Sequence, residues 1–186
     1  MDLILFGIQG SGKGTQAKRL AAEKGFTIFE AGGELRKIAA SGSALGNEVK
    51  SFIDIGKLVP HEIIMNVLRE AIEKHPKDEH LLFDGVPRDE NQMRDFDVVM
   101  KKLGRDFRCI HIRLDPEEGV RRILKRAEIE GRADDASEET IRKRMNLFTE
   151  KTLPVIKGYT AQGKVTDIDG MGNTEEIYQR MVDVLS

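Results

Sequence analysis

The chain has 186 residues, enough to bury a hydrophobic core in one globular domain. Lys and Arg together number 30 and Asp and Glu 32, so the net charge is −2 and gives no general attraction to nucleic acid or to a membrane. We expect neither as a partner. The single cysteine, Cys109, excludes a disulfide framework and a cysteine-ligated zinc site.

The chain starts with MDLILFGIQG, which contains an acid and only four consecutive apolar residues. Such a run is too short for the core of a signal peptide or for a helix that spans a membrane. We therefore expect a soluble, cytoplasmic protein, and we expect it to be a monomer.

Short apolar runs alternate with longer helical patterns. The runs expected to be strands are, in chain order, Leu3–Phe6, Thr27–Phe29, Leu81–Asp84, Arg108–Leu114 and Lys164–Ile168. They are β-branched or aromatic, as is typical of strands covered on both faces. This alternation predicts an α/β fold, a three-layer sandwich in which helices flank a five-stranded parallel sheet.

Helix starts are marked in two places. Asp115 is a predicted N-cap, followed by a proline and then by glutamates, and Asn173 opens the last helix in a similar way. Two segments, 30–58 and 127–137, fit the alternation poorly because glycines or acids interrupt them. We interpret both as insertions at the ligand-binding edge of the sheet.

A glycine-rich loop, GIQGSGKGT over residues 7–15, follows the first predicted strand. Glycines let the backbone turn tightly and point N–H groups at phosphate oxygens, and the next helix, from Lys13 to about Ala22, adds the positive end of its dipole. Lys13 can reach the β- and γ-phosphates of a nucleotide, and Thr15 can help to hold its magnesium ion. The strand–loop–helix context disfavours the alternative, a turn that only connects two elements, and makes the sandwich a P-loop fold.

A phosphate loop alone does not identify a kinase, which also needs a second anion site for its acceptor. Arg88 follows the third predicted strand, at the edge where residues beyond strand ends line the ligand crevice. Arg36 lies in the first inserted segment. Two guanidinium groups can clamp a phosphate, although either arginine alone could be a solvated surface group.

Five motifs occur in a fixed order along the chain: GxxGxGKGT at 7–15, LR at 35–36, GKLVP at 56–60, DGxPR at 84–88 and GRxDD at 131–135. With these motifs the chain resembles the adenylate kinases and their nucleoside-monophosphate kinase relatives over essentially its whole length. The resemblance implies ATP and AMP as substrates and Mg²⁺, bound with ATP, as the cofactor. It also implies a short lid that lacks the zinc-bearing insertion of some relatives.

The domain organisation implied by the resemblance is a single kinase domain over residues 1–186. Its parts are a core at about 1–29, 60–124 and 136–186, an NMP-binding helical flap at about 30–59, and a short lid at about 125–135.

The resemblance also implies a set of site residues. Those that bind ATP would be Gly10, Ser11, Gly12, Lys13, Gly14, Thr15, Arg122, Arg126 and, near the base, Gly172. Those that bind AMP would be Ala31, Arg36, Lys57, Val59, Gly85, Arg88, Gln92, Arg132 and Arg144. The residues acting on the transferred group would be Lys13, Arg88, Arg126, Arg132 and Arg144. Asp84 would orient magnesium-bound water. Asp84 and Thr15 would both lie near the nucleotide-bound Mg²⁺, and no residue is assigned as its direct ligand.

Chemistry explains why arginines dominate this set. The nucleophile is a phosphate oxygen that is largely ionised at neutral pH, so no general base is needed. The protein then has to position the two nucleotides and to stabilise the charge of a loose transition state. Segment 121–144 holds six arginines and six acids, so a salt-linked surface is an alternative there. Glu138 lies four residues before Arg142, so the two can form an ion pair on the surface of a helix. Arg144 has Thr140 at that spacing and therefore has no acidic partner of this kind.

Three positions leave the identity of the acceptor nucleotide undecided. Gln92 could read adenine, or it could cap a helix together with Asp89. Ala31 and Gly33 stand where AMP-using relatives commonly carry a threonine and an aspartate, and the alanine is also similar to UMP/CMP kinases. We therefore expect an adenylate kinase, with a UMP/CMP or broad-acceptor kinase as the alternative and a non-catalytic nucleotide-binding module as a further one.

Overall fold

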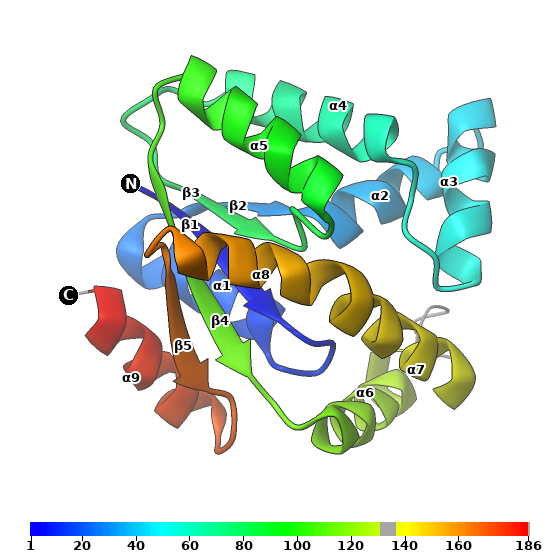
Figure 1. Cartoon of the computed structure of the whole chain (residues 1–186). Coiled ribbons are helices and arrows are strands. Elements are labelled where there is room, and N and C mark those ends of the chain that lie inside the picture. The colour runs from blue at the N-terminus through cyan, green and yellow to red at the C-terminus, as the bar shows by residue number, and fades with distance from the viewer. Residues whose placement is uncertain (131–136, 186) are drawn as a thin grey trace.

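The computed structural model describes residues 1–130 and 137–185. These residues form a five-stranded, fully parallel sheet with the order β2-β3-β1-β4-β5 (Figure 1). The strands are β1 (Asp2–Gly7), β2 (Thr27–Glu30), β3 (Leu81–Asp84), β4 (Phe107–Arg113) and β5 (Val165–Asp169). The predicted parallel sheet is confirmed, and each strand end lies within one residue of its expected place.

The two faces of the sheet are covered by different helices (Figure 1). On one face lie α1 (Lys13–Lys24) and α9 (Thr174–Leu185), and on the other lie α4 (His61–Glu73), α5 (Glu90–Lys102) and α8 (Leu153–Ala161). Alternate residues of β1 serve the two layers, because successive side chains of a strand point to opposite faces. Leu3 packs with α1 and α9, and Ile4 packs with the other group. The three-layer sandwich is thereby confirmed.

Both predicted helix starts are present. Asp115 Oδ1 accepts hydrogen bonds from the backbone N–H groups of Glu117 and Glu118, at 2.9 and 3.2 Å, at the start of α6 (Pro116–Glu130). At α9, Asn173 and Glu176 exchange side chain to backbone hydrogen bonds of 2.8 and 3.0 Å. These caps satisfy N–H groups that have no partner inside the helix.

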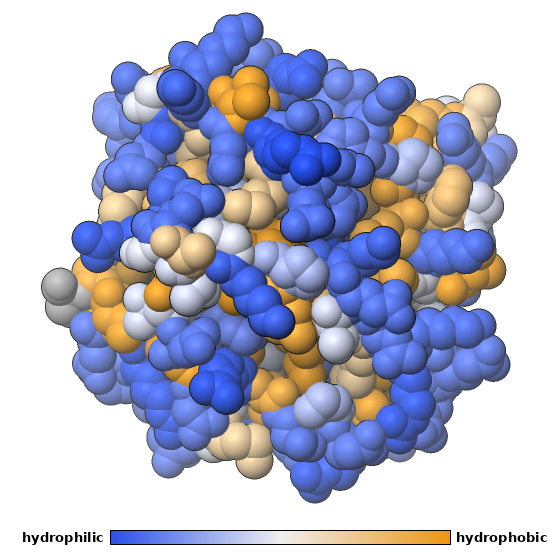
Figure 2. Space-filling view, viewed as in Figure 1, coloured by the Kyte–Doolittle hydropathy of each residue, from blue (hydrophilic) through white to orange (hydrophobic). Residues whose placement is uncertain are grey.

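Of the two segments that fit the alternation poorly, the first lies beside the carboxyl ends of the strands, and most of the second, 127–137, lies outside the described residues. Segment 30–59 contains the two helices α2 (Ala31–Ala39) and α3 (Ala44–Asp54). On the other side, α6 is followed by α7 (Glu138–Leu147), which continues through a single π-helical turn, η2 (Phe148–Thr152), into α8. Such turns are frequent at functional sites. The face of the molecule seen in Figure 1 is mainly hydrophilic, with hydrophobic residues visible between polar ones near its middle (Figure 2).

Cys109 is buried in β4, as its apolar neighbours predict. Burial disfavours the thiolate and raises the pKa of this thiol to about 12. The thiol is therefore an unreactive part of the core.

Candidate active site

A cavity of about 390 Å³ lies at the carboxyl ends of the strands, between segment 30–59, α6 and α7. In an open parallel sheet this is the edge at which ligands bind. The predicted site residues that line it are Gly10, Gly12, Lys13, Gly14, Thr15, Arg36, Lys57, Val59, Asp84, Gly85, Arg88, Arg122, Arg126 and Arg144. Four of the five sequence motifs, those at 7–15, 35–36, 56–60 and 84–88, thus converge on one cavity although they are far apart in the chain, and the fifth, at 131–135, lies outside the described residues.

The glycine-rich loop connects β1 to α1 in a shape that its sequence explains. Gly10 has a φ of 82°, in the left-handed region, and a Cβ there would lie 2.6 Å from the carbonyl oxygen of Gly119. A side chain at this position would be strained and would also clash with α6. The loop therefore lies close against α6, and α1 begins at Lys13 with its N-terminal N–H groups at the cavity.

Lys13 spans the loop. Its Nζ donates to the carbonyl oxygens of Gly7 and Ile8, at 2.7 and 3.1 Å. The pKa of Lys13 is lowered to about 8, mainly by burial; Asp84 opposes this shift, and the charges of Arg88, Arg144 and Arg126 add to it. A cation in these surroundings is strongly stabilised by electrostatic attraction when an anion such as a phosphate enters the cavity.

Asp84 is an acid within this cationic cavity. It ends β3, is 8% exposed, and has a carboxylate 3.8 Å from where a Cβ of Gly14 would lie. Burial raises the pKa of Asp84, and Lys13 opposes this rise while Glu30 adds to it. A buried acid among phosphate-binding cations is suited to hold a cation or its bound water.

Arg36 and Arg88 lie on the side of the cavity formed by segment 30–59 and the turn after β3. Hydrogen bonds to the backbone and side chain hold Arg88 in place. Its Nε donates to the Gly85 carbonyl oxygen at 2.6 Å, its backbone N–H donates to Gln92 Oε1 at 2.8 Å, and its carbonyl oxygen accepts from Thr152 Oγ1 at 2.9 Å. Arg36 Nη2 donates to Glu30 Oε1 at 2.8 Å.

Arg122 and Arg126 of α6 and Arg144 of α7 line the opposite side. Arg122 donates to Glu118 at 2.7 Å and to the carbonyl oxygen of Gly170, at 3.2 Å, which joins α6 to the loop after β5. Arg142, by contrast, forms ion pairs with Glu138 at 2.8 Å and with Glu117 at 2.9 Å. The predicted Arg142–Glu138 pair is confirmed.

Some predicted site residues do not line the cavity. Ser11 is fully buried beneath the loop, and within the described residues its hydroxyl has no hydrogen-bond partner. Ala31 and Gln92 are buried beside the turn after β3, and Gly172 lies in the exposed loop after β5. Arg132, together with the lid residues after 130, falls outside the described residues.

Thr152 and Glu30 are among the cavity residues that the sequence did not identify. Thr152 comes from the π-helical turn and reaches Arg88 across 64 positions of the chain, so no local pattern indicates it. Glu30 ends β2 and pairs in register with Asp84, which ends β3. Its position at the carboxyl end of a predicted strand, where Asp84 also lies, was the signal that could have identified it.

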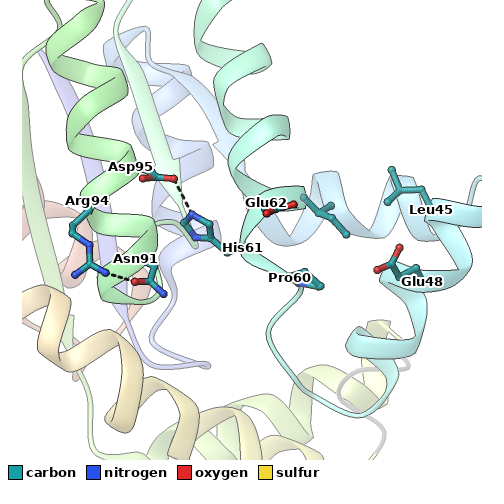
Figure 3. A pocket seen from close by; sticks show the side chains of 9 residues that line it. Leu45, Glu48, Pro60, His61, Glu62, Asn91, Arg94 and Asp95 are labelled. Atoms are coloured by element: carbon teal, nitrogen blue, oxygen red, sulfur yellow. Dashed lines mark hydrogen bonds and ion pairs between the residues drawn. The ribbon is translucent and has the colours of Figure 1, made fainter.

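A larger cavity of about 690 Å³ lies on the outer side of segment 30–59, between α3 and the starts of α4 and α5 (Figure 3). His61 points at Asp95, with Nε2 and Oδ2 2.8 Å apart, and Arg94 pairs with Asn91. This larger cavity is lined by acidic and basic side chains, some of which pair with one another, and none of the predicted site residues lines it. We assign the chemistry to the smaller cavity for this reason.

Comparison with known proteins gives a consistent family. A family model described as adenylate kinase matches residues 5–164. The chain is 41% identical over 180 residues to an adenylate kinase of Thermus thermophilus, covering 96% of this chain and 94% of the relative. It is 39% identical over 178 residues to that of Maricaulis maris, covering 95% and 94%, and 34% identical over 189 residues to that of Bacteroides fragilis, covering 100% of both.

Proposed function

The chain belongs to the adenylate kinase family, and we propose on this basis that it transfers the γ-phosphoryl group of ATP reversibly to AMP, giving two ADP. The observation that supports this most is the convergence of Lys13, Arg36, Arg88, Arg126 and Arg144 on one cavity. The alternative of a UMP/CMP kinase is not favoured, because these relatives are adenylate kinases by name.

The reaction needs charge and position rather than a general base. The acceptor phosphate is largely ionised at neutral pH, and the transition state spreads charge over the oxygens of the transferred group. Lys13 and the loop N–H groups hold the phosphates of ATP, with Arg122 and Arg126 beside them. Arg144 contributes charge to the transferred group from α7.

The acceptor side consists of segment 30–59 and the turn after β3. Arg36 and Arg88 hold the acceptor phosphate, and Gly85 and Val59 line the space next to it. Residues 30–59 act as the NMP-binding flap and 125–135 as the lid, and closure of the two excludes water as a competing acceptor. Arg132 completes the charge around the transferred group.

Magnesium suits the oxygen donors at this site. The Asp84 carboxylate and the Thr15 hydroxyl both line the cavity next to Lys13, and Mg²⁺ is held by few protein oxygens because it keeps several of its waters. Bound together with ATP, Mg²⁺ would supply positive charge to the nucleotide phosphates. Asp84 would orient magnesium-bound water.

We expect EDTA to abolish activity and Mg²⁺ alone to restore it fully. The reason is that this chain has one cysteine, and its segment 121–144 has no histidine, so the lid lacks zinc ligands. A coupled assay after chelation, with Mg²⁺ or Mg²⁺ plus Zn²⁺ added back, measures this. Recovery that required zinc would show that the lid is misassigned.

Gln92 bears on the choice of acceptor. Its Oε1 accepts from the Arg88 N–H at 2.8 Å, and its own backbone N–H donates to Asp89 Oδ1 at 2.9 Å. Because the donor is an N–H, the oxygen of the amide must face Arg88, and Nε2 is left as a donor for a base. We propose that Gln92 reads adenine in addition to supporting the turn.

We expect Gln92→Glu to separate these two roles. The carboxylate still accepts from the Arg88 N–H, so the turn keeps this hydrogen bond, but the side chain no longer donates to the base. The preference for AMP over CMP in kcat/KM should fall about three- to tenfold, the value of one hydrogen bond. A coupled assay with ATP and AMP, CMP, UMP or GMP measures this ratio.

The control is Gln92→Met, which should lower both the melting temperature and the ratio, because it removes the acceptor as well as the donor. An unchanged ratio in Gln92→Glu would leave the glutamine as a helix cap only. A wild-type preference for CMP or UMP would contradict the proposed function itself.

The substrates are ATP and AMP, and we propose that the protein acts as a cytoplasmic monomer. Along the described residues, no helix has the length and apolar character needed to cross a membrane.

A further inference from the structure

Glu30 places a carboxylate on the acceptor side of the cavity. It is the last residue of β2 and occupies the N-cap position of α2, yet its side chain makes no capping hydrogen bond there. Its Oε1 instead accepts from Arg36 Nη2 at 2.8 Å. Both residues line the cavity, together with Lys13 and Arg88. The acid is thus directed at an arginine of the phosphate site rather than at its own helix.

The glycines at the start of α2 leave room for this pair. A Cβ on Gly33 would lie 3.1 Å from Glu30 Oε2, and a Cβ on Gly32 would lie 3.1 Å from Arg36 Nη1. Both distances are shorter than ordinary van der Waals contact, so a side chain at either position would press on the ion pair. The sequence therefore combines an acid at position 30 with two glycines that allow it to reach Arg36.

The pair is held weakly enough to be exchanged. The side chains of Arg36 and Glu30 are 36% and 43% exposed, and ion pairs of that kind contribute little to stability. A phosphate monoester carries a charge of about −1.5 to −2 at neutral pH, against −1 for a carboxylate. It also binds a guanidinium through two parallel hydrogen bonds. A phosphate that reaches Arg36 can therefore displace Glu30.

We propose that the Glu30 carboxylate is an internal occupant of the acceptor-phosphate site, which the phosphate of AMP displaces from Arg36 when it binds. This inference rests on the proposed function, because it takes Arg36 as a ligand of the acceptor phosphate. Its consequence is that Glu30 raises the KM for AMP and leaves the KM for ATP unaffected. While the site is empty, the pair also keeps other anions away from Arg36.

The test is Glu30→Gln, which removes the charge but keeps the size of the side chain. We expect the KM for AMP to fall about two- to fivefold, as for removal of a partly exposed ion pair that competes with the ligand. The KM for ATP and kcat should change less than about twofold. Calorimetric titration with AMP alone should show the same gain in affinity, independently of turnover.

Glu34→Gln is the matched control. It removes the same charge from the same helix, but Glu34 pairs with Lys37 at 2.7 Å and does not line the cavity. Its KM for AMP should equal that of the wild type. In an Arg36→Ala background, Glu30→Gln should no longer tighten AMP binding, because the carboxylate has lost the group for which it competes.

Three results would overturn the inference. A raised KM for AMP in Glu30→Gln would mean that the carboxylate orients Arg36, and an unchanged KM would mean that it does not compete. A fall in kcat with a higher Mg²⁺ requirement would place Glu30 at the metal. Wild-type turnover of ATP with AMP is measured first, since its absence would contradict the proposed function and not this role of Glu30.

Discussion

Replacing Lys13 by methionine is expected to lower kcat by about 10³-fold with little change in the melting temperature. The ammonium group is the cation at the centre of the loop, surrounded by Arg88, Arg126 and Arg144, and methionine keeps the apolar stem without the charge. A preorganised charge at a developing phosphoryl transition state contributes on this scale. The measurement is kcat under saturating ATP and AMP, with thermal denaturation alongside.

Lys24→Met is the matched control for that variant. Lys24 lies in the last turn of the same helix, is exposed and does not line the cavity, so its loss should change kcat less than about twofold. A Lys13→Met protein that kept wild-type turnover would show that the loop binds phosphate through its backbone alone.

The pKa of Lys13 also predicts a pH dependence. Burial lowers this pKa to about 8 in the free protein, so kcat/KM for ATP should fall about tenfold per pH unit above pH 8. Stability responds in the opposite sense. The unfolded chain keeps this proton up to about pH 10.5, and the folded chain releases it from about pH 8. The buried charge of Lys13 therefore lowers the free energy of unfolding below pH 8, and this loss is gradually removed as the pH rises from about 8 to about 10.5. A kcat/KM that stays level to pH 9.5 would contradict the lowered pKa.

Arg144→Ala is expected to lower kcat by about 10²-fold, because the guanidinium lines the cavity near Lys13 and stabilises charge on the transferred group. Arg142→Ala should change kcat less than about threefold, since Arg142 lies two residues away on α7 and pairs with Glu138 and Glu117 on the surface. Equal losses in the two variants would mean that the α7–α6 contact, rather than the charge of Arg144, supports catalysis.

The features that the sequence predicted well are local ones. The strands are runs of β-branched and aromatic residues between turns, and the phosphate loop follows β1 with glycines at fixed spacing. Arg142 could be explained by Glu138 one turn before it, and that pair is present at 2.8 Å. Arg144 had no acid at that spacing, and it lines the cavity.

The features that the sequence did not predict depend on contacts between distant segments. Thr152 reaches the Arg88 carbonyl oxygen only because a π-helical turn joins α7 to α8, and no residue pattern marks that turn. Glu30 was not assigned a role from the sequence, because its reach to Arg36 depends on the space that Gly32 and Gly33 leave. Neither contact follows from propensity or periodicity.

At this cavity, we propose, the γ-phosphoryl group of ATP is transferred to a nucleotide and not to water. Phosphorus NMR of the protein with Mg²⁺ and ATP, recorded before and after addition of AMP, tests it most directly. We predict that ATP stays intact until AMP is added, and that two ADP then appear for each AMP consumed, with no inorganic phosphate. Release of ADP and inorganic phosphate in equal amounts without AMP would contradict the account.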